Sequence, residues 1–157
     1  MKFIYLFVCF LAMASISFAQ KTKTVEIWKK PITGETLQIM YIEHKDTGLI
    51  DTLVHFMAQD HQYQELTHII TLYAGTPKGF YNYLNNIEKF FKENEPNTSD
   101  YIDGHKIDIV EMVKVRGIWI SEKREQGNGY HGFSPKALNK FKSKFVDWCK
   151  KNNVPYE

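Results

Sequence analysis

Two amphipathic segments with the same start constrain the fold of this chain most. A hydroxyl residue followed by proline stands at Thr76–Pro77 and again at Ser134–Pro135, 58 positions later (134 minus 76). A hydroxyl at this position can accept a backbone N–H that the first helical turn leaves unpaired, and proline lacks the N–H that would otherwise need a partner. The sequence therefore predicts two helices, the first ending near Asn94 because Pro96 disfavours helix before it.

Apolar residues recur at helical spacing in both segments, and many of them are aromatic. The first stripe consists of Phe80, Tyr83, Leu84, Ile87, Phe90 and Phe91, and the second of Leu138, Phe141, Phe145, Trp148 and Cys149. We expect both helices to cover one shared core, and we interpret the recurrence as a ββα unit used twice. The alternative is coincidence, since such caps and stripes are common.

Runs of β-branched and aromatic residues precede each helix. They occupy residues 25–28, 36–44, 49–57, 66–73 and 106–122. Lys45–Gly48 has the composition of a hairpin turn, and Gly117 suggests a bulge or a tight corner within the last run. The pattern predicts an α+β fold, with an antiparallel or mixed sheet of about five or six strands and both helices on one face. The other face is then open to solvent and available for binding.

The first nineteen residues have the features of a secretory signal peptide. Lys2 is followed by an apolar run from Phe3 to Met13, and Ser17–Ala19 places small residues before a cleavage point at Gln20. We expect residues 1–19 to be removed and residues 20–157 to form a single domain, located in the periplasm or outside the cell. The remaining chain has no apolar stretch long enough to cross a membrane.

Charge and cysteine content exclude several classes of function. The net charge of +2 falls to +1 when Lys2 is lost, which argues against electrostatic binding of nucleic acid. Cys149 is then the only cysteine, so no intramolecular disulfide can form. Its place on the apolar stripe predicts a buried thiol rather than a nucleophile.

The Gly127–Gly132 segment matches the G-x-G-x-x-G string of dinucleotide-binding proteins. Such a site needs a strand directly before the motif and a helix opening within it, and neither is expected here. We therefore predict no cofactor. We interpret residues 122–132 as a loop on which Arg124, Tyr130 and His131 could touch a ligand.

The histidines and serines give little support for catalysis or metal binding. His61 and His68 flank a polar segment that includes Asp60 and Glu65, which makes them weak candidates for a metal site. No H-E-x-x-H or Cys-x-x-Cys motif is present, and no serine lies in a G-x-S-x-G elbow. We predict no catalytic residues, and the sequence favours a protein that is not an enzyme.

Aromatic residues outside the helical stripes suggest a contact surface, because aromatics often anchor protein interfaces. Our first hypothesis is an exported, non-enzymatic module that binds a protein or peptide, as an inhibitor or toxin-neutralising protein would. Its predicted binding residues are Tyr63, Trp119, Arg124, Tyr130 and His131. The lysine-rich segment Lys136–Lys151 suggests an acidic partner, although it could equally be a solvated face. The alternatives are a small histidine-dependent enzyme or metal-binding protein of the cell envelope, and a structural component that oligomerises through a sheet edge.

Overall fold

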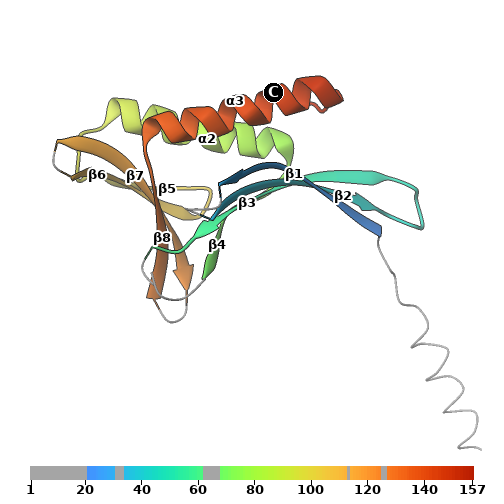
Figure 1. Cartoon of the computed structure of the whole chain (residues 1–157), viewed down its shortest axis with the longest axis horizontal. Helices are drawn as coiled ribbons and strands as arrows, with labels where there is room; N and C mark the ends of the chain where they lie inside the picture. The colour runs from blue at the N-terminus through green and yellow to red at the C-terminus, as the bar shows by residue number, and fades with distance from the viewer. Residues whose placement is uncertain (1–20, 31–33, 62–67, 113, 125–126) are drawn as a thin grey trace, which may run out of the picture.

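The computed structural model describes residues 21–30, 34–61, 68–112, 114–124 and 127–157 (Figure 1). In this part of the chain, four strands followed by a helix occur twice in succession. The first half contains β1 (Lys21–Lys30), β2 (Glu35–Glu43), β3 (Ile50–Gln59), β4 (Ile69–Gly75) and α2 (Pro77–Glu93). The second contains β5 (Ser99–Ile102), β6 (His105–Met112), β7 (Val115–Arg124), β8 (Gly127–Phe133) and α3 (Pro135–Asn152).

The fold class is α+β, as predicted, but the single sheet of five or six strands is wrong. The described residues form two four-stranded sheets in the orders β1-β2-β3-β4 (sheet A) and β5-β6-β7-β8 (sheet B). All pairings within both sheets are antiparallel. The repeated unit is consequently longer than the predicted ββα, with four strands before each helix.

Two features explain most of the difference in strand number. The run 106–122 folds back on itself, with Lys114 at a φ of 65° between β6 and β7. Gly117 lies within β7 opposite Val110, so it is neither the corner nor a bulge. Within the expected loop 122–132, residues 122–124 are the end of β7, and residues 127–132 belong to the glycine-rich strand β8. Glycine is depleted in strands generally, which is why the sequence pattern indicated a loop.

The predicted helices and the first hairpin are confirmed. Thr76 Oγ1 accepts a hydrogen bond from Gly79 N at 3.1 Å, and Ser134 Oγ accepts one from Ala137 N at 3.2 Å. Between β2 and β3, Gly48 has a φ of 68° and donates its N–H to the carbonyl of His44 at 2.7 Å. Each of these features depends on residues close together in sequence.

Both helices lie on the same side of the two sheets (Figure 1). They run antiparallel: the rings of Phe80 and Phe145 are 5.0 Å apart, and further along Glu88 accepts a hydrogen bond from Lys142 at 2.7 Å. Each helix packs on the sheet of its own half and also extends over the sheet of the other half. The contacts that show this are Trp28–Phe141 and Tyr41–Trp148 for α3 on sheet A, and Tyr83–His105 and Phe91–Arg116 for α2 on sheet B.

One shared core results from these contacts between the halves. Phe56 on β3 is fully buried, and its ring centroid lies 5.2–5.8 Å from those of Phe80, Phe133 and Phe141. Cys149 is also buried, and burial raises the pKa of its thiol to about 11. Within the described residues, no helix is both long enough and apolar enough to span a membrane.

Candidate functional site

The candidate site lies on the face of sheet B that points away from the helices. Along β7, Ile118 and Ile120 are buried in the core, so Trp119 between them faces the opposite side. On β8, Phe133 packs inward and Tyr130 outward. Tyr130 is paired with Ser121, two residues from Trp119. The two outward rings stack with their centroids 4.8 Å apart and an interplanar angle of 24°.

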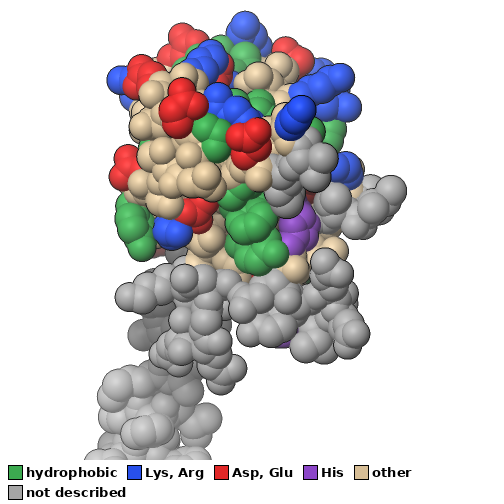
Figure 2. All heavy atoms as spheres, turned by 90° about the vertical axis from the view of Figure 1, so that its left-hand side faces the viewer, with side chains coloured by type: hydrophobic (Ala, Val, Ile, Leu, Met, Phe, Trp, Pro, Cys, Tyr) green, Lys and Arg blue, Asp and Glu red, His purple; other side chains and the backbone are tan. Residues whose placement is uncertain are grey.

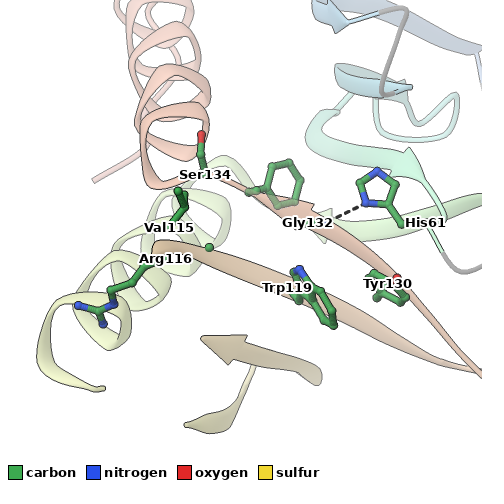
Figure 3. A pocket seen from close by; sticks show the side chains of 9 residues that line it. His61, Val115, Arg116, Trp119, Tyr130, Gly132 and Ser134 are labelled. Atoms are coloured by element: carbon green, nitrogen blue, oxygen red, sulfur yellow. Dashed lines mark hydrogen bonds between the residues drawn. The ribbon is translucent and has the colours of Figure 1, made fainter. Parts of the chain in front are cut away.

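A concave space of about 510 Å³ opens beside this aromatic pair (Figure 3). It is lined by His61, Val115, Arg116, Gly117, Trp119, Tyr130, Gly132, Phe133 and Ser134, and we call it the aromatic site. Two glycines keep its floor open. A Cβ at Gly132 would lie 3.2 Å from the Trp119 indole, so a side chain there would displace the ring. The absence of side chains is thus what forms the hollow between the aromatic and polar walls.

His61 reaches the aromatic site because the segment after β3 lies along the outer edge of β8. His61 N donates to the carbonyl of Tyr130 at 2.7 Å, and Tyr130 N donates to Asp60 Oδ1 at 3.1 Å. The backbone N–H of Gly132 then donates to His61 Nδ1 at 3.3 Å, so this nitrogen is the acceptor and the neutral ring carries its proton on Nε2. The pairing therefore fixes the tautomer of the neutral imidazole.

The surroundings of His61 favour its neutral form. Burial is the largest cause that lowers its pKa, and the charge of His131 lowers it further, while Glu35 and Asp60 act in the opposite direction. The rings of the two histidines are 4.0 Å apart. A neutral, oriented imidazole beside two aromatic rings can donate a hydrogen bond to a carbonyl group of a ligand.

The expectation that His131 touches a ligand from a loop is wrong. His131 lies on β8 and is fully buried on the core side of the sheet. Its Nδ1 donates to the carbonyl of Gln59 at 2.6 Å, and its Nε2 is 3.3 Å from Glu35 Oε1. The Glu35 side chain is itself buried, with Lys30 Nζ 3.8 Å from its Oε2. His131 thus joins β8 of the second half to β2 and β3 of the first.

The other predicted site residues lie elsewhere or outside the described residues. Tyr63 lies in 62–67, outside the described part. Arg124 pairs with Gly127 through its backbone at the end of the β7–β8 hairpin, and its side chain is also outside the described part. His68 is exposed, and its carbonyl accepts the N–H of Asp60 at 2.8 Å. Trp119, Tyr130 and His61 are the predicted residues that the fold brings together.

Several lining residues were not identified from the sequence. Val115 is 67% exposed at the start of β7 and forms one end of the site. Arg116 donates from Nη2 to the carbonyls of Phe91 and Asn94, at 3.1 and 2.5 Å, and so closes the C-terminal end of α2. Gly117 and Trp119 are two residues apart, so the sequence places them on the same face of β7. That spacing indicates a binding site only when β8 is known to lie beside β7.

The lysine-rich helix α3 is partly engaged within the chain. Lys142 pairs with Glu88, and the ammonium of Lys140 lies 5.1 Å from the centre of the Trp28 ring. Lys136, Lys144, Lys150 and Lys151 are exposed. These four remain available to an acidic partner.

Across the residues that the structure describes, no group of three or more His, Cys, Asp or Glu side chains is arranged to hold a metal ion.

A comparison with protein-family models found no match to this chain, and neither did a comparison with curated proteins.

Proposed function

We propose that the chain is an exported, non-enzymatic module that binds a protein or peptide partner through the aromatic site. The observation that carries this proposal is the stacked pair Trp119–Tyr130, which stands beside a glycine-floored hollow on the sheet face without helices. Tryptophan and tyrosine are among the residues most enriched at the energetic hot spots of protein interfaces. Their side chains have few rotatable bonds, so binding costs them little conformational entropy. An inhibitor or toxin-neutralising protein is one form of such a module.

The size and chemistry of the aromatic site suit a segment of polypeptide. Its volume of about 510 Å³ can accept a few side chains of a peptide. The apolar walls bury hydrophobic groups, while the Nε2–H of His61 and the polar ends of Trp119 and Tyr130 can bond to peptide carbonyls. We infer that the ligand presents an apolar side chain next to accessible backbone.

Selection from a displayed peptide library tests this proposal. Peptides enriched on the chain beginning at Gln20 should bind Trp119→Ala or Tyr130→Ala at least about 30-fold more weakly, the effect of an anchor worth about 2 kcal/mol. Leu49→Ser is the matched control, because Leu49 is 65% exposed and does not line the site. Enriched peptides that bound Trp119→Ala and Tyr130→Ala as tightly as the unmodified chain would refute the proposal.

A variant that fills the site separates binding from folding. A Cβ on Gly117 would meet only Phe133 O and Val110 Cγ2, both at an ordinary contact distance of 3.5 Å. Gly117→Val should therefore keep or raise the melting temperature, since valine favours strands, while it abolishes peptide binding. Full binding by a folded Gly117→Val protein would mean that the ligand lies elsewhere.

The histidine-dependent or metal-binding alternative is favoured by one observation, the 4.0 Å separation of the His61 and His131 rings above the buried Glu35. Both ring nitrogens of His131 already have partners, so a metal would have to displace one of them. Elemental analysis of protein purified without a histidine tag distinguishes the two functions. A stoichiometric transition metal that is lost in His61→Ala would favour the alternative.

Export is part of the same proposal. We infer that residues 1–19 direct the chain to the periplasm or the exterior and are removed. Fractionation of the producing cell, followed by N-terminal sequencing, should find a chain starting at Gln20 outside the cytoplasm. An intact Met1 in the cytoplasmic fraction would contradict it.

A further inference from the structure

Two grooves occupy equivalent positions in the two halves of the molecule. Each lies between an outermost strand, β1 or β5, and the helix that packs over it. The α3 groove has a volume of about 400 Å³ and is lined by Lys21, Lys23, Val25, Tyr41, Glu43, Ile50, Trp148 and Asn152. The α2 groove, of about 440 Å³, is lined by Asn86, Lys89, Phe90, Glu93, Asn94, Asp100, Tyr101, Ile102 and Asp103.

The helix residues of the two grooves correspond. Phe90 and Asn94 line the α2 groove, and Trp148 and Asn152, each 58 positions later (148 minus 90 and 152 minus 94), line the α3 groove. An aromatic side chain followed one turn later by asparagine thus stands at the same place in both halves. The two ends of the molecule therefore have a groove of the same kind, with an aromatic residue and an asparagine at corresponding positions.

Their charges are opposite. The α3 groove carries two lysines and one carboxylate, so its net charge is +1. The α2 groove carries three carboxylates and one lysine, so its net charge is −2. Figure 2 faces the sheet B end of the molecule, where Asp and Glu side chains lie among Lys, Arg, hydrophobic and uncharged ones. The two grooves therefore share their position in the fold but differ in the sign of their net charge.

This difference decides which strand edges can meet. Strands β1 and β5 each have a strand partner on one side only among the described residues, and such an edge can pair with another strand. A contact between two β1 edges would set Lys21 and Lys23 against each other, and a contact between two β5 edges would oppose Asp100 and Asp103. Only the contact of β5 with β1 brings unlike charges together.

An exposed aromatic residue provides an anchor for the same contact. Tyr101 on β5 is 71% exposed, one of the most exposed large hydrophobic residues in the described chain. The α3 groove offers an apolar floor formed by Val25, Tyr41, Ile50 and Trp148. Tyr101 stands next to Asp100, so docking of the ring would carry a carboxylate toward the groove lysines.

We propose that a second copy of this chain occupies the α3 groove: β5 of one copy docks along β1 of the next, with Tyr101 in the groove. The contact is head-to-tail, so an assembly of any length keeps one free β1 edge at one end and one free β5 edge at the other, and it grows as an open chain. The aromatic site lies on the helix-free face and remains accessible.

Sedimentation velocity of the chain beginning at Gln20 tests this proposal. Strand β5 has only four residues, so the contact is small and weak, and concentrations from about 1 to about 300 μM are needed to follow it. The mean mass should rise with concentration in about 50 mM salt and fall toward one protomer in about 500 mM salt, since opposite charges are screened. Tyr101→Ser should weaken the association at least about tenfold.

Charge reversal at each end gives the decisive measurement. Lys21→Glu/Lys23→Glu makes both ends acidic, and Asp100→Lys/Asp103→Asn makes both ends basic. Asparagine is chosen at 103 because Asp103 has a φ of 48°, which asparagine tolerates. Each variant alone should stay monomeric, and an equimolar mixture of the two should associate. Thermal melts by circular dichroism establish that both are folded.

A matched control makes the same change of charge as Lys21→Glu/Lys23→Glu, but away from the grooves. Lys78→Glu/Lys136→Glu replaces exposed lysines in the first turns of α2 and α3, where a carboxylate is favourable, and should associate as the unmodified chain does. The proposal is overturned if the unmodified chain stays monomeric to about 300 μM in low salt. It is equally overturned if the folded reversal variants associate alone, or if their mixture does not associate.

Discussion

Replacement of Phe56 by alanine should destabilise both halves of the molecule at once. The Phe56 side chain is fully buried on β3, and it contacts rings from α2, β8 and α3. Two of those three elements belong to the second half of the chain. The cavity left by Phe56→Ala would therefore open where the halves meet.

The expected loss is large for one substitution. Truncation of a buried phenylalanine costs about 3–5 kcal/mol, and the three lost ring contacts place Phe56 toward the upper end of that range. Domains of this size have total stabilities of about 5–15 kcal/mol. With a urea dependence of about 2 kcal/mol per M, a loss of about 4 kcal/mol lowers the unfolding midpoint by about 2 M.

Urea unfolding followed by circular dichroism and by tryptophan fluorescence provides the assay. Tryptophan fluorescence reports on both sheets, because Trp28 lies in sheet A and Trp119 in sheet B. If the sheets share one core, the fluorescence and the circular dichroism should change in one coincident transition. Leu49→Ala, at a position that is 65% exposed, should change the unfolding free energy by less than about 0.5 kcal/mol. A loss below about 1.5 kcal/mol for Phe56→Ala, or two separate transitions, would refute the idea of a shared core.

Three further predictions concern single side chains. Gly79→Ala should destabilise the protein by about 1–3 kcal/mol, because its Cβ would lie 2.2 Å from the Tyr73 hydroxyl, and the added change Tyr73→Phe should restore stability in thermal melts. The free energy of unfolding should fall as the pH is lowered from about 7.5 to about 5.5. Burial lowers the pKa of three histidines below the ordinary 6.5, so in this range the unfolded chain binds more protons than the folded chain. A free energy of unfolding that does not change over this range would contradict the prediction. These histidines are His55, His61 and His105. Cys149, with its buried thiol, should react with a chromogenic disulfide reagent at about pH 8 only after denaturant is added, and rapid reaction in the native protein would show that α3 opens.

The features that the sequence predicted correctly are those whose physical causes are local. A hydroxyl cap, a proline and an apolar stripe act within one or two turns, so the two helices and their buried faces follow from a short window. The same holds for the hairpin turn at Gly48 and for the buried Cys149. No residue from another part of the chain is needed for these inferences.

The candidate site was predictable only in part, for the same reason. Trp119 and Tyr130 were identified because they lie outside the helical stripes, but their stacking depends on the register that places Ser121 opposite Tyr130. His131 shared the pattern of a ligand-contacting residue and is instead buried against Glu35, 96 positions away in sequence. A partner so distant leaves no trace in the local pattern.

The sequence by itself determined two helix starts, one hairpin and the α+β class, because backbone capping and side-chain periodicity act over a few residues. The tertiary structure alone decided that β8 is a strand, that the sheets are two, and that each helix also packs on the sheet of the other half. Strand β8 has few apolar side chains of its own, and its order comes from β7 on one side and from Asp60 and His61 on the other. Such non-local hydrogen bonds form only when the whole chain is folded.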